Sequence, residues 1–208
     1  MPAKAKKRSY DSPARQRQAD DTRKRIAVAA QKLLTQNGYA GMTIPAVARA
    51  AGVAVPTVYA IFGSKKGIVA ELLDQARFGD GYQALIEEKK QVASPREQLS
   101  FAARIARQVY DAEVPVENLL RGAGMLAPEL ATIENERDCR RHDAQAGLID
   151  ALQKGKVLRP GLDRESARDI LWSLTGRDLY RMLVRERKWT SEQYEGWLKE
   201  MLERALVG

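Results

Sequence analysis

The stretch from Thr43 to Ile68 reads TIPAVARAAGVAVPTVYAIFGSKKGI and contains two short helical patterns separated by a glycine. In the first pattern, apolar residues recur at the i, i+3, i+4, i+7 spacing of one helical face. Thr43 stands where a helix N-cap belongs, and Gly52 supplies the left-handed residue that ends such a helix. The stretch therefore predicts a helix that ends at Gly52, a tight turn, and a second helix from about Val55 to Phe62.

The second of these helices is expected to bury its valines and Phe62 and to leave a different kind of surface outside. The outward side chains are small, hydroxyl-bearing or aromatic: Pro56, Thr57, Tyr59 and Ala60. A short second helix of this kind is typical of DNA recognition. Lys65 and Lys66 follow at the start of the next helix, where they oppose the helix dipole. A bound phosphate would offset that conflict and would accept from the free N–H groups of the helix end.

The block from Thr22 to Ile68 resembles the DNA-binding domain of the tetracycline-repressor (TetR) family of bacterial transcription regulators. The resemblance rests on ordered signals: a Thr-capped first helix, Asn37-Gly38-Tyr39, Thr43, AxAAGV, T-x-Y and F-x-SK. It implies that phosphates are contacted by four residues, Thr43, Thr57, Tyr59 and Lys65. It also implies that the residues nearest the bases are Ala54, Val55, Pro56 and Ala60.

One position departs from the family pattern. Position 54 is often Ser or Thr in this family, where it caps the recognition helix, but here it is Ala54 and has no capping oxygen. Val55, Pro56 and Ala60 also lack the hydrogen-bonding groups that read base edges. Sequence choice is therefore expected to depend on thymine-methyl contacts, backbone fit or the N-terminal arm.

The distribution of charge supports a nucleic-acid-binding head. The chain of 208 residues has a formal net charge of +8. Residues 1–66 hold 13 Lys and Arg against 3 Asp and Glu, whereas the remainder holds 22 against 24. A basic module on a near-neutral body is the pattern of an anion-binding domain, although a solubilising tail explains residues 1–17 equally well. We expect a disordered basic arm over 1–20, a helix-turn-helix domain over 21–66, and a ligand-binding and dimerisation domain over 67–208.

Several other classes of function find little support. Cys139 is the single cysteine, so an intramolecular disulfide is excluded. Cys139 and His142 share a helical spacing that suits a metal, but arginines crowd the same stretch, and we expect a solvated charged face. The sequence has no catalytic triad pattern, HExxH or phosphate-cradling glycine loop, so we expect no enzyme, cofactor or metal. It also has no signal-peptide pattern or long apolar run, and a cytoplasmic bacterial protein is expected.

The remainder of the chain predicts helices and no strands. One helix is expected over about 22–37, and another begins at Lys65 with Phe78 on its inner face. Three more are expected to open at Pro95, Pro115 and Pro128, and two last helices are expected over 163–188 and 190–206. Gly79 and Gly81 either kink the helix from Lys65 as a hinge or mark an ordinary boundary between two helices. The fold class is therefore all-α, with a three-helix DNA-binding domain, a C-terminal helical domain and about nine helices in all.

The last two predicted helices are more apolar than one chain needs. An amphipathic helix requires only one apolar stripe to pack against the core of its own chain. The additional apolar side chains predict an isologous dimer interface, and the alternative is a plain core helix. The resemblance implies the same arrangement. The expected interface residues are Leu171, Leu174, Leu179, Leu183, Tyr194, Trp197, Leu198 and Met201.

The resemblance further implies a small molecule bound inside the C-terminal bundle. The candidate lining residues are Phe78, Phe101, Ile105, Met125 and Trp172, with Arg104 and Gln108 as polar partners. Ordinary core packing is the alternative for each of them.

Together these features indicate a homodimeric, sequence-specific transcription regulator. We expect a repressor that is released from a pseudo-palindromic, double-stranded DNA operator by a small-molecule effector. Two heads would enter successive major grooves about 34 Å apart. Two alternatives remain open: a ligand-independent architectural DNA binder, and a small-molecule-binding helical bundle that binds DNA weakly.

Overall fold

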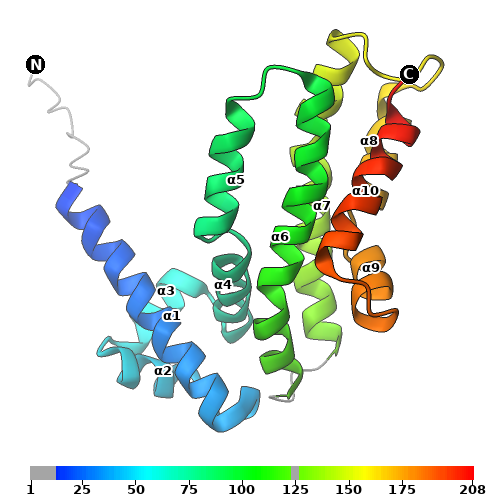
Figure 1. Cartoon of the computed structure of the whole chain (residues 1–208). Coiled ribbons are helices and arrows are strands. Elements are labelled where there is room, and N and C mark those ends of the chain that lie inside the picture. The colour runs from blue at the N-terminus through cyan, green and yellow to red at the C-terminus, as the bar shows by residue number, and fades with distance from the viewer. Residues whose placement is uncertain (1–12, 123–126) are drawn as a thin grey trace, which may run out of the picture. The chain divides into compact units, whose positions relative to one another are not determined.

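The computed structural model describes residues 13–122 and 127–208, and these residues are mainly helical (Figure 1). Over these ranges, β pairing is limited to an isolated antiparallel bridge between Leu158 and Val207. The predicted all-α fold class is therefore confirmed. The chain divides into two compact units, Met1–Glu71 and Leu72–Gly208.

The first unit is a small helical domain. It holds α1 (Pro13–Gly41), α2 (Ile44–Ala51), α3 (Val55–Phe62) and the beginning of α4 (Lys65–Arg77). Each of these helices contributes buried apolar side chains to the unit: Ile26, Ala30, Leu34, Val47, Val58, Phe62 and Ile68. The pattern of small and branched side chains that predicted α2 and α3 thus forms the core beneath them.

Helix α1 begins earlier than the sequence pattern predicted. Residues 13–20 were expected to be disordered, but the helix starts at Pro13, where a missing N–H costs nothing. The Gln16 side chain donates to Asp20 (3.3 Å) and the Thr22 hydroxyl donates to the Gln18 carbonyl (2.8 Å). Gly38, the predicted end of the helix, has a non-helical φ of 69° and appears as a kink. The rest of the predicted arm, residues 1–12, lies outside the described residues.

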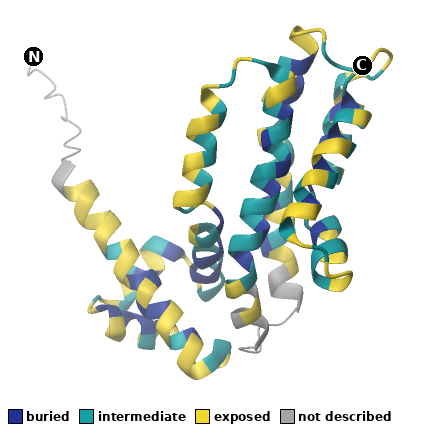
Figure 2. Ribbon diagram, viewed as in Figure 1, coloured by how far each residue is buried: buried dark blue, intermediate teal, exposed yellow. Residues whose placement is uncertain are grey.

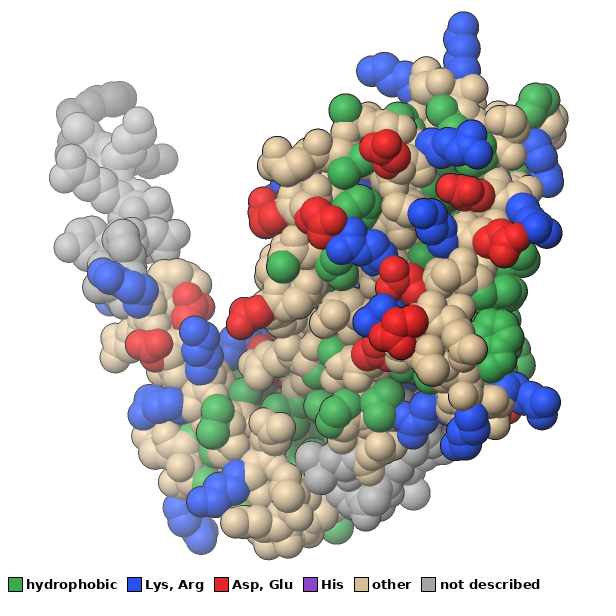
Figure 3. Space-filling view, viewed as in Figure 1, with side chains coloured by type: hydrophobic (Ala, Val, Ile, Leu, Met, Phe, Trp, Pro, Cys, Tyr) green, Lys and Arg blue, Asp and Glu red, His purple; other side chains and the backbone are tan. Residues whose placement is uncertain are grey.

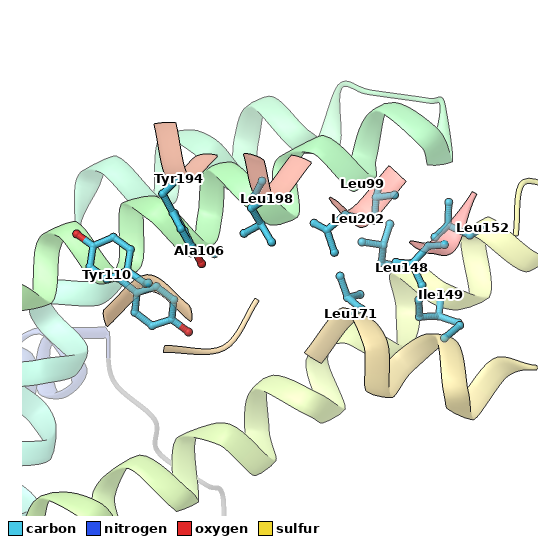
Figure 4. Close-up of a cluster of buried hydrophobic side chains, with 14 residues drawn as sticks. Leu99, Ala106, Tyr110, Leu148, Ile149, Leu152, Leu171, Tyr194, Leu198 and Leu202 are labelled. Atoms are coloured by element: carbon cyan, nitrogen blue, oxygen red, sulfur yellow. The ribbon is translucent and has the colours of Figure 1, made fainter. Parts of the chain in front are cut away.

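The second unit is a larger helical bundle. It contains the end of α4, then α5 (Asp80–Lys90), α6 (Pro95–Gly122), α7 (Ala127–Lys154) and α8 (Arg164–Leu174), followed by α9 (Arg177–Tyr180), the π-helical turn η1 (Arg181–Glu186) and α10 (Ser191–Leu206). Its core joins α6, α7, α8 and α10 through the leucines and isoleucine shown in Figure 4, which are Leu99, Leu148, Ile149, Leu152, Leu171, Leu198 and Leu202.

The helix boundaries around the glycines near residue 80 are now defined. Helix α4 ends at Arg77, and Gly79 adopts an extended conformation before α5 begins. This is an ordinary boundary between two helices, and a signalling role for Gly79 and Gly81 stays a prediction. Phe78 lies just beyond the end of α4 and is 44% exposed, so its predicted place on the inner face of that helix was wrong.

Two further predicted boundaries were also wrong. Pro115 was expected to open a helix, but α6 continues through it to Gly122. A proline inside a helix costs roughly 3 kcal/mol, and the packing of this long helix outweighs that cost. The predicted helix over 163–188 is broken, because α8 ends at Leu174 with Thr175 as its C-cap and Gly176 is extended. Gly176 is therefore the N-cap of α9.

Side-chain caps stand at the starts of α8 and α10. Asp163 accepts from the backbone N–H groups of Glu165 and Ser166 (both 3.0 Å). Thr190 forms a capping box with Gln193 at the start of α10.

Within the described residues, no single helix is long and apolar enough to cross a membrane, although α2 and α3 meet that composition test as a bent pair.

Candidate nucleic-acid interface and ligand cavity

The turn between α2 and α3 is built by local hydrogen bonds. The Thr43 hydroxyl accepts from the Ala46 N–H at 3.3 Å, as its N-cap position predicted. Gly52 has a φ of 65° and donates to carbonyls in the last turn of α2, and the Val53 N–H donates to the Ala48 carbonyl at 3.0 Å. The two helices are bent by 107°, which is within the range of a helix-turn-helix motif.

Helix α3 divides into a buried face and an outer face. Val58 and Phe62 are buried, while Val55 and Thr57 are half-buried. The outer face carries the side chains predicted to meet DNA, with Tyr59 52% exposed beside three smaller exposed residues, Ala54, Pro56 and Ala60. Ala54 is the N-cap and makes no side-chain capping hydrogen bond. The outer face of α3 thus exposes four of the predicted contact residues, Ala54, Pro56, Tyr59 and Ala60, whereas Thr43 and Lys65 belong to α2 and α4.

The start of α4 is held close to α3. The Ser64 hydroxyl accepts from the Gly67 N–H at 3.0 Å and so caps the first turn of α4. A Cβ atom on Gly67 would lie 1.9 Å from the Phe62 carbonyl oxygen, so this position requires glycine. The Lys65 ammonium lies 3.8 Å from the centroid of the Tyr39 ring.

A second contact ties α1 to α3 and α4. The Arg23 guanidinium donates to the Glu71 carboxylate through Nη2 (2.7 Å) and Nε (3.0 Å), and it lies 5.2 Å from the centroid of the Phe62 ring. The hydrogen bonds that Arg23 donates to the Glu71 carboxylate raise the pKa of Arg23. Arg23 and Glu71 are far apart in the chain, so no spacing in the sequence indicates this contact.

Lys and Arg side chains are spread over the surface of the first unit on the face shown in Figure 3. The described basic side chains at the ends of its short helices are Arg49, which is exposed, and Lys65 and Lys66, which are half-buried. A surface of this charge attracts the phosphate backbone of nucleic acids without regard to sequence.

The second unit contains a cavity of about 430 Å³. Side chains from α4, α5, α6 and α7 line it, together with Leu171 near the end of α8 and two residues that follow, Thr175 and Arg177. On α5 the lining residues Tyr82, Ile86 and Lys89 recur at helical spacing, and Ile105 and Val109 do so on α6. Helix α5 has no fully buried residue, as the absence of dark blue along it in Figure 2 shows. A volume of this size is typical of sites for small organic molecules.

The cavity includes some of the predicted ligand residues and not others. Phe78 and Ile105 line it. Phe101 is buried in the core with Arg104 over its ring at 4.7 Å, and Arg104 pairs with Glu88 (2.6 Å), so neither lines the cavity. Gln108 and Trp172 are also absent from the lining, and Trp172 donates to the Asp138 carbonyl at 3.1 Å. Met125 lies outside the described residues.

One wall of the cavity is a network of buried charges that sequence reasoning missed. Arg77, 5% exposed, pairs with Glu113 and with Glu134 (3.0 Å). Arg177 pairs with the same two carboxylates at 2.5 Å and 2.9 Å. Arg137 pairs with Asp74 at 2.9 Å. Burial lowers the pKa of Arg77 to about 10, against the opposing influence of Glu134. These groups are charged neighbours only in the folded chain, so sequence spacing gave no signal for them.

Hydrogen bonds from α6 and α7 hold the end of α8 beside the cavity. The Arg141 Nη1 donates to the Trp172 carbonyl (2.6 Å) and to the Thr175 hydroxyl (2.9 Å), and Gln145 donates to that hydroxyl at 2.8 Å. Tyr110, on α6, donates to the Thr175 carbonyl at 2.8 Å. The break that ends α8 is thereby coupled to residues that line the cavity.

The residues predicted for a dimer interface separate into two groups. Leu171, Tyr194 and Leu198 are fully buried inside the single chain, so they belong to its own core and their assignment to an interface was wrong. The other five are partly exposed and remain candidates: Leu174, Leu179, Leu183, Trp197 and Met201. Met182, in η1, precedes Leu183 in the sequence and is 39% exposed, so it is a further accessible apolar side chain.

The stretch considered for a metal site makes other contacts. His142 Nε2 lies 3.0 Å from Asp169 Oδ1, and its ring meets Trp172 edge to face. Cys139 is exposed.

Comparison with known proteins agrees with the geometry of the first unit. Residues 26–72 match the family of bacterial regulatory proteins described as the tetR family. A curated relative, the uncharacterized HTH-type transcriptional regulator YdeS of Bacillus subtilis, is 28% identical over 171 residues, which cover 79% of this chain and 80% of that protein. Residues 26–72 therefore form a TetR-family DNA-binding domain, and the resemblance predicted from the sequence is confirmed over that segment.

Solved structures share the fold over both units. NalD, the secondary repressor of the MexAB-OprM multidrug efflux pump in Pseudomonas aeruginosa, aligns with a TM-score of 0.61 at 21% identity, covering 91% of this chain and 98% of NalD. A transcriptional regulator from Saccharomonospora viridis in complex with choline gives 0.60 at 22%, covering 91% and 99%. FadR from Bacillus subtilis in complex with stearoyl-CoA gives 0.57 at 22%, covering 86% and 96%.

Proposed function

We propose that this protein is a homodimeric repressor that binds a pseudo-palindromic operator and is released from it by a small molecule. The outer face of α3 supports the proposal most strongly. It carries Tyr59 and small side chains that a major groove accommodates. It belongs to the segment that matches the family of regulators.

In this proposal, contacts to phosphates supply most of the affinity. Thr43 and Tyr59 are exposed, and Thr57 and Lys65 are half-buried. Their hydroxyl and ammonium groups would bind phosphate oxygens. The bases would meet the small apolar residues of α3, so methyl contacts and DNA shape would set the sequence preference. Such a regulator would act in the bacterial cytoplasm, on the chromosome.

A dimer would place two such heads on one duplex. Two-fold related heads reach successive major grooves when their half-sites are about 34 Å apart. The partly exposed leucines, Trp197 and Met201 on α8, α9, η1 and α10 are the proposed interface. Burying such a surface against its own copy is the usual way in which a soluble chain forms a closed pair.

Regulation would arise from the cavity in the second unit. A ligand shifts an equilibrium between two conformations only if it binds one of them more tightly. The half-buried side chains of α5 are the part of the lining that a ligand would order. NalD is a repressor by name and FadR was solved with stearoyl-CoA, and these properties fit the proposal for this chain.

The outer face of α3 also favours a second candidate function. It offers the bases no side-chain hydrogen-bond group at positions 54–56 and 60, and its N-cap is unsatisfied. A protein with this surface could bind DNA through phosphates alone, as an architectural protein that ignores small molecules.

Selection of bound duplexes from a random DNA pool at near-physiological salt distinguishes the two candidates. Enrichment of a palindrome, with two chains per duplex in sedimentation, is the result expected of a dimeric operator-binding protein. If no sequence is enriched and binding vanishes as salt rises, binding is purely electrostatic and the operator proposal fails.

A further inference from the structure

The cavity in the second unit is lined by more cationic than anionic side chains. Six basic residues line it, namely Arg77, Lys89, Arg137, Arg140, Arg141 and Arg177, against three acidic ones, namely Asp74, Glu134 and Asp138. An excess of one sign in a partly enclosed site selects ligands of the opposite sign. Which of these cations is available to a ligand depends on how each is paired.

Four of the arginines are already engaged by carboxylates. Arg77, Arg137 and Arg177 share three carboxylates, Asp74, Glu113 and Glu134, in a network whose formal charges cancel. Arg141 pairs with Asp138 at 3.2 Å and also holds the end of α8. This wall is therefore neutralised within the protein and gives an anion little advantage.

Lys89 and Arg140 are the lining cations that make no ion pair with the residues that the structure describes. Arg140 is exposed, and its Nε donates to the Glu136 carbonyl at 3.4 Å. Lys89 is half-buried, and desolvation lowers its pKa. A desolvated ammonium that has no carboxylate partner gains more from a bound anion than an exposed one does.

Apolar side chains continue from Lys89 along the cavity. Tyr82 and Ile86 lie on the same face of α5 as Lys89, and the rise along the helix from Tyr82 to Lys89 is about 10 Å. Ile105 and Val109 line the cavity from α6. The two helices are antiparallel, since Glu88 pairs with Arg104 while Gly81 lies against Gln108. Lys89 therefore lies toward one end of this apolar surface, at the level of Arg104.

We propose that the cavity binds an amphipathic organic anion, with its carboxylate on the Lys89 ammonium and its apolar body between α5 and α6. This inference deepens the proposed function, because it names the chemical class of the effector. The regulatory role of the ligand rests on that function. Binding of the ligand depends only on the cavity in the second unit.

The test compares two probes of equal length and opposite charge, decanoate and decylamine, by isothermal titration calorimetry on the full chain. The wild-type protein is expected to bind decanoate at one site per chain, at least tenfold more tightly than decylamine. Lys89→Met is expected to reduce this preference about tenfold, which is the loss expected for one charge-assisted hydrogen bond. Lys89→Arg keeps the charge and should restore the preference.

The neighbouring lysine supplies the matched control. Lys90 is exposed, pairs with Glu87 at 2.6 Å and does not line the cavity, so Lys90→Met should leave both affinities unchanged. The proposal is overturned if decylamine binds as tightly as decanoate, if decanoate does not bind, or if Lys89→Met keeps the wild-type preference. Circular dichroism of each variant verifies that the helical fold is retained.

Failure of this inference is distinguishable from failure of the proposed function. A palindrome enriched by a protein that does not bind decanoate would overturn the ligand class and leave the operator-binding protein intact. Decanoate binding that depends on Lys89, in a protein that enriches no DNA sequence, would support the ligand class and overturn the regulator.

Discussion

The Lys65 ammonium lies 3.8 Å from the centroid of the Tyr39 ring, which connects the first residue of α4 to the chain just beyond the kink of α1. This contact holds a cation beside a helix N-terminus, where the helix dipole opposes it. A phosphate at the same place would be bound by the ammonium and by the helix N–H groups together. The arrangement explains why a lysine is useful at a position that does not stabilise the helix.

Lys65→Ala should weaken binding to all DNA sequences by a similar factor. Removing one phosphate contact makes the negative slope of log K against log salt shallower by about 1 and leaves the preferred sequence unchanged. Fluorescence anisotropy over a salt series measures both quantities. Lys154→Ala, at the end of α7 in the other unit, should behave like the wild type. A changed sequence preference at unchanged affinity would show that Lys65 contacts bases instead.

Tyr59→Phe should also weaken binding without changing specificity. The variant keeps the exposed ring and removes the hydroxyl, so the expected loss is that of one phosphate hydrogen bond, roughly 1 kcal/mol. Anisotropy titrations with the enriched duplex and with a scrambled duplex should show the same loss. A loss confined to the enriched duplex would place the hydroxyl on a base.

Ala54→Ser should stabilise the protein. Ala54 is the N-cap of α3 and has no capping oxygen, and a serine there would accept from a free N–H for a gain of about 1 kcal/mol. Urea denaturation followed by circular dichroism measures the change. Ala60→Ser is the control, because this exposed residue of α3 is not a cap, and serine there should cost a few tenths of a kcal/mol. Equal effects of the two substitutions would contradict the capping argument.

The DNA-binding head was predictable because its signals are local. The Thr43 cap, the Gly52 turn and the missing cap at Ala54 depend on contacts within a few residues, and the structure has each of them. Local rules misled where packing dominates, as at Pro115, which lies inside α6.

The cavity was predictable in its existence and not in its lining. Ile105, a candidate implied by the family resemblance, does line the cavity, but Lys89 and Tyr82 line it through the placement of α5 against α6. The pairing of Arg77 and Arg177 with Glu113 joins residues from three helices. Such contacts have no spacing in the sequence that a periodicity argument can detect.

Glu113→Gln should destabilise the second unit strongly. Glu113 is 1% exposed and faces the guanidinium groups of Arg77 and Arg177, so its loss leaves buried positive charge under-compensated. Breaking a buried ion pair on one side costs roughly 3–5 kcal/mol. Chemical denaturation measures this loss. Glu87→Gln breaks the exposed pair with Lys90 and should change stability by less than about 0.5 kcal/mol. A similar small effect at Glu113 would show that the network is not structural.

The most direct test of the whole account is the affinity for the enriched duplex with and without decanoate. The dissociation constant should rise in the wild-type protein when decanoate is added, and it should stay unchanged in Lys89→Met, because a ligand acts on DNA binding only through its own differential binding. Lys90→Met should respond as the wild type does. If calorimetry shows that decanoate binds at Lys89 and the dissociation constant for DNA does not change, then the cavity does not regulate the head.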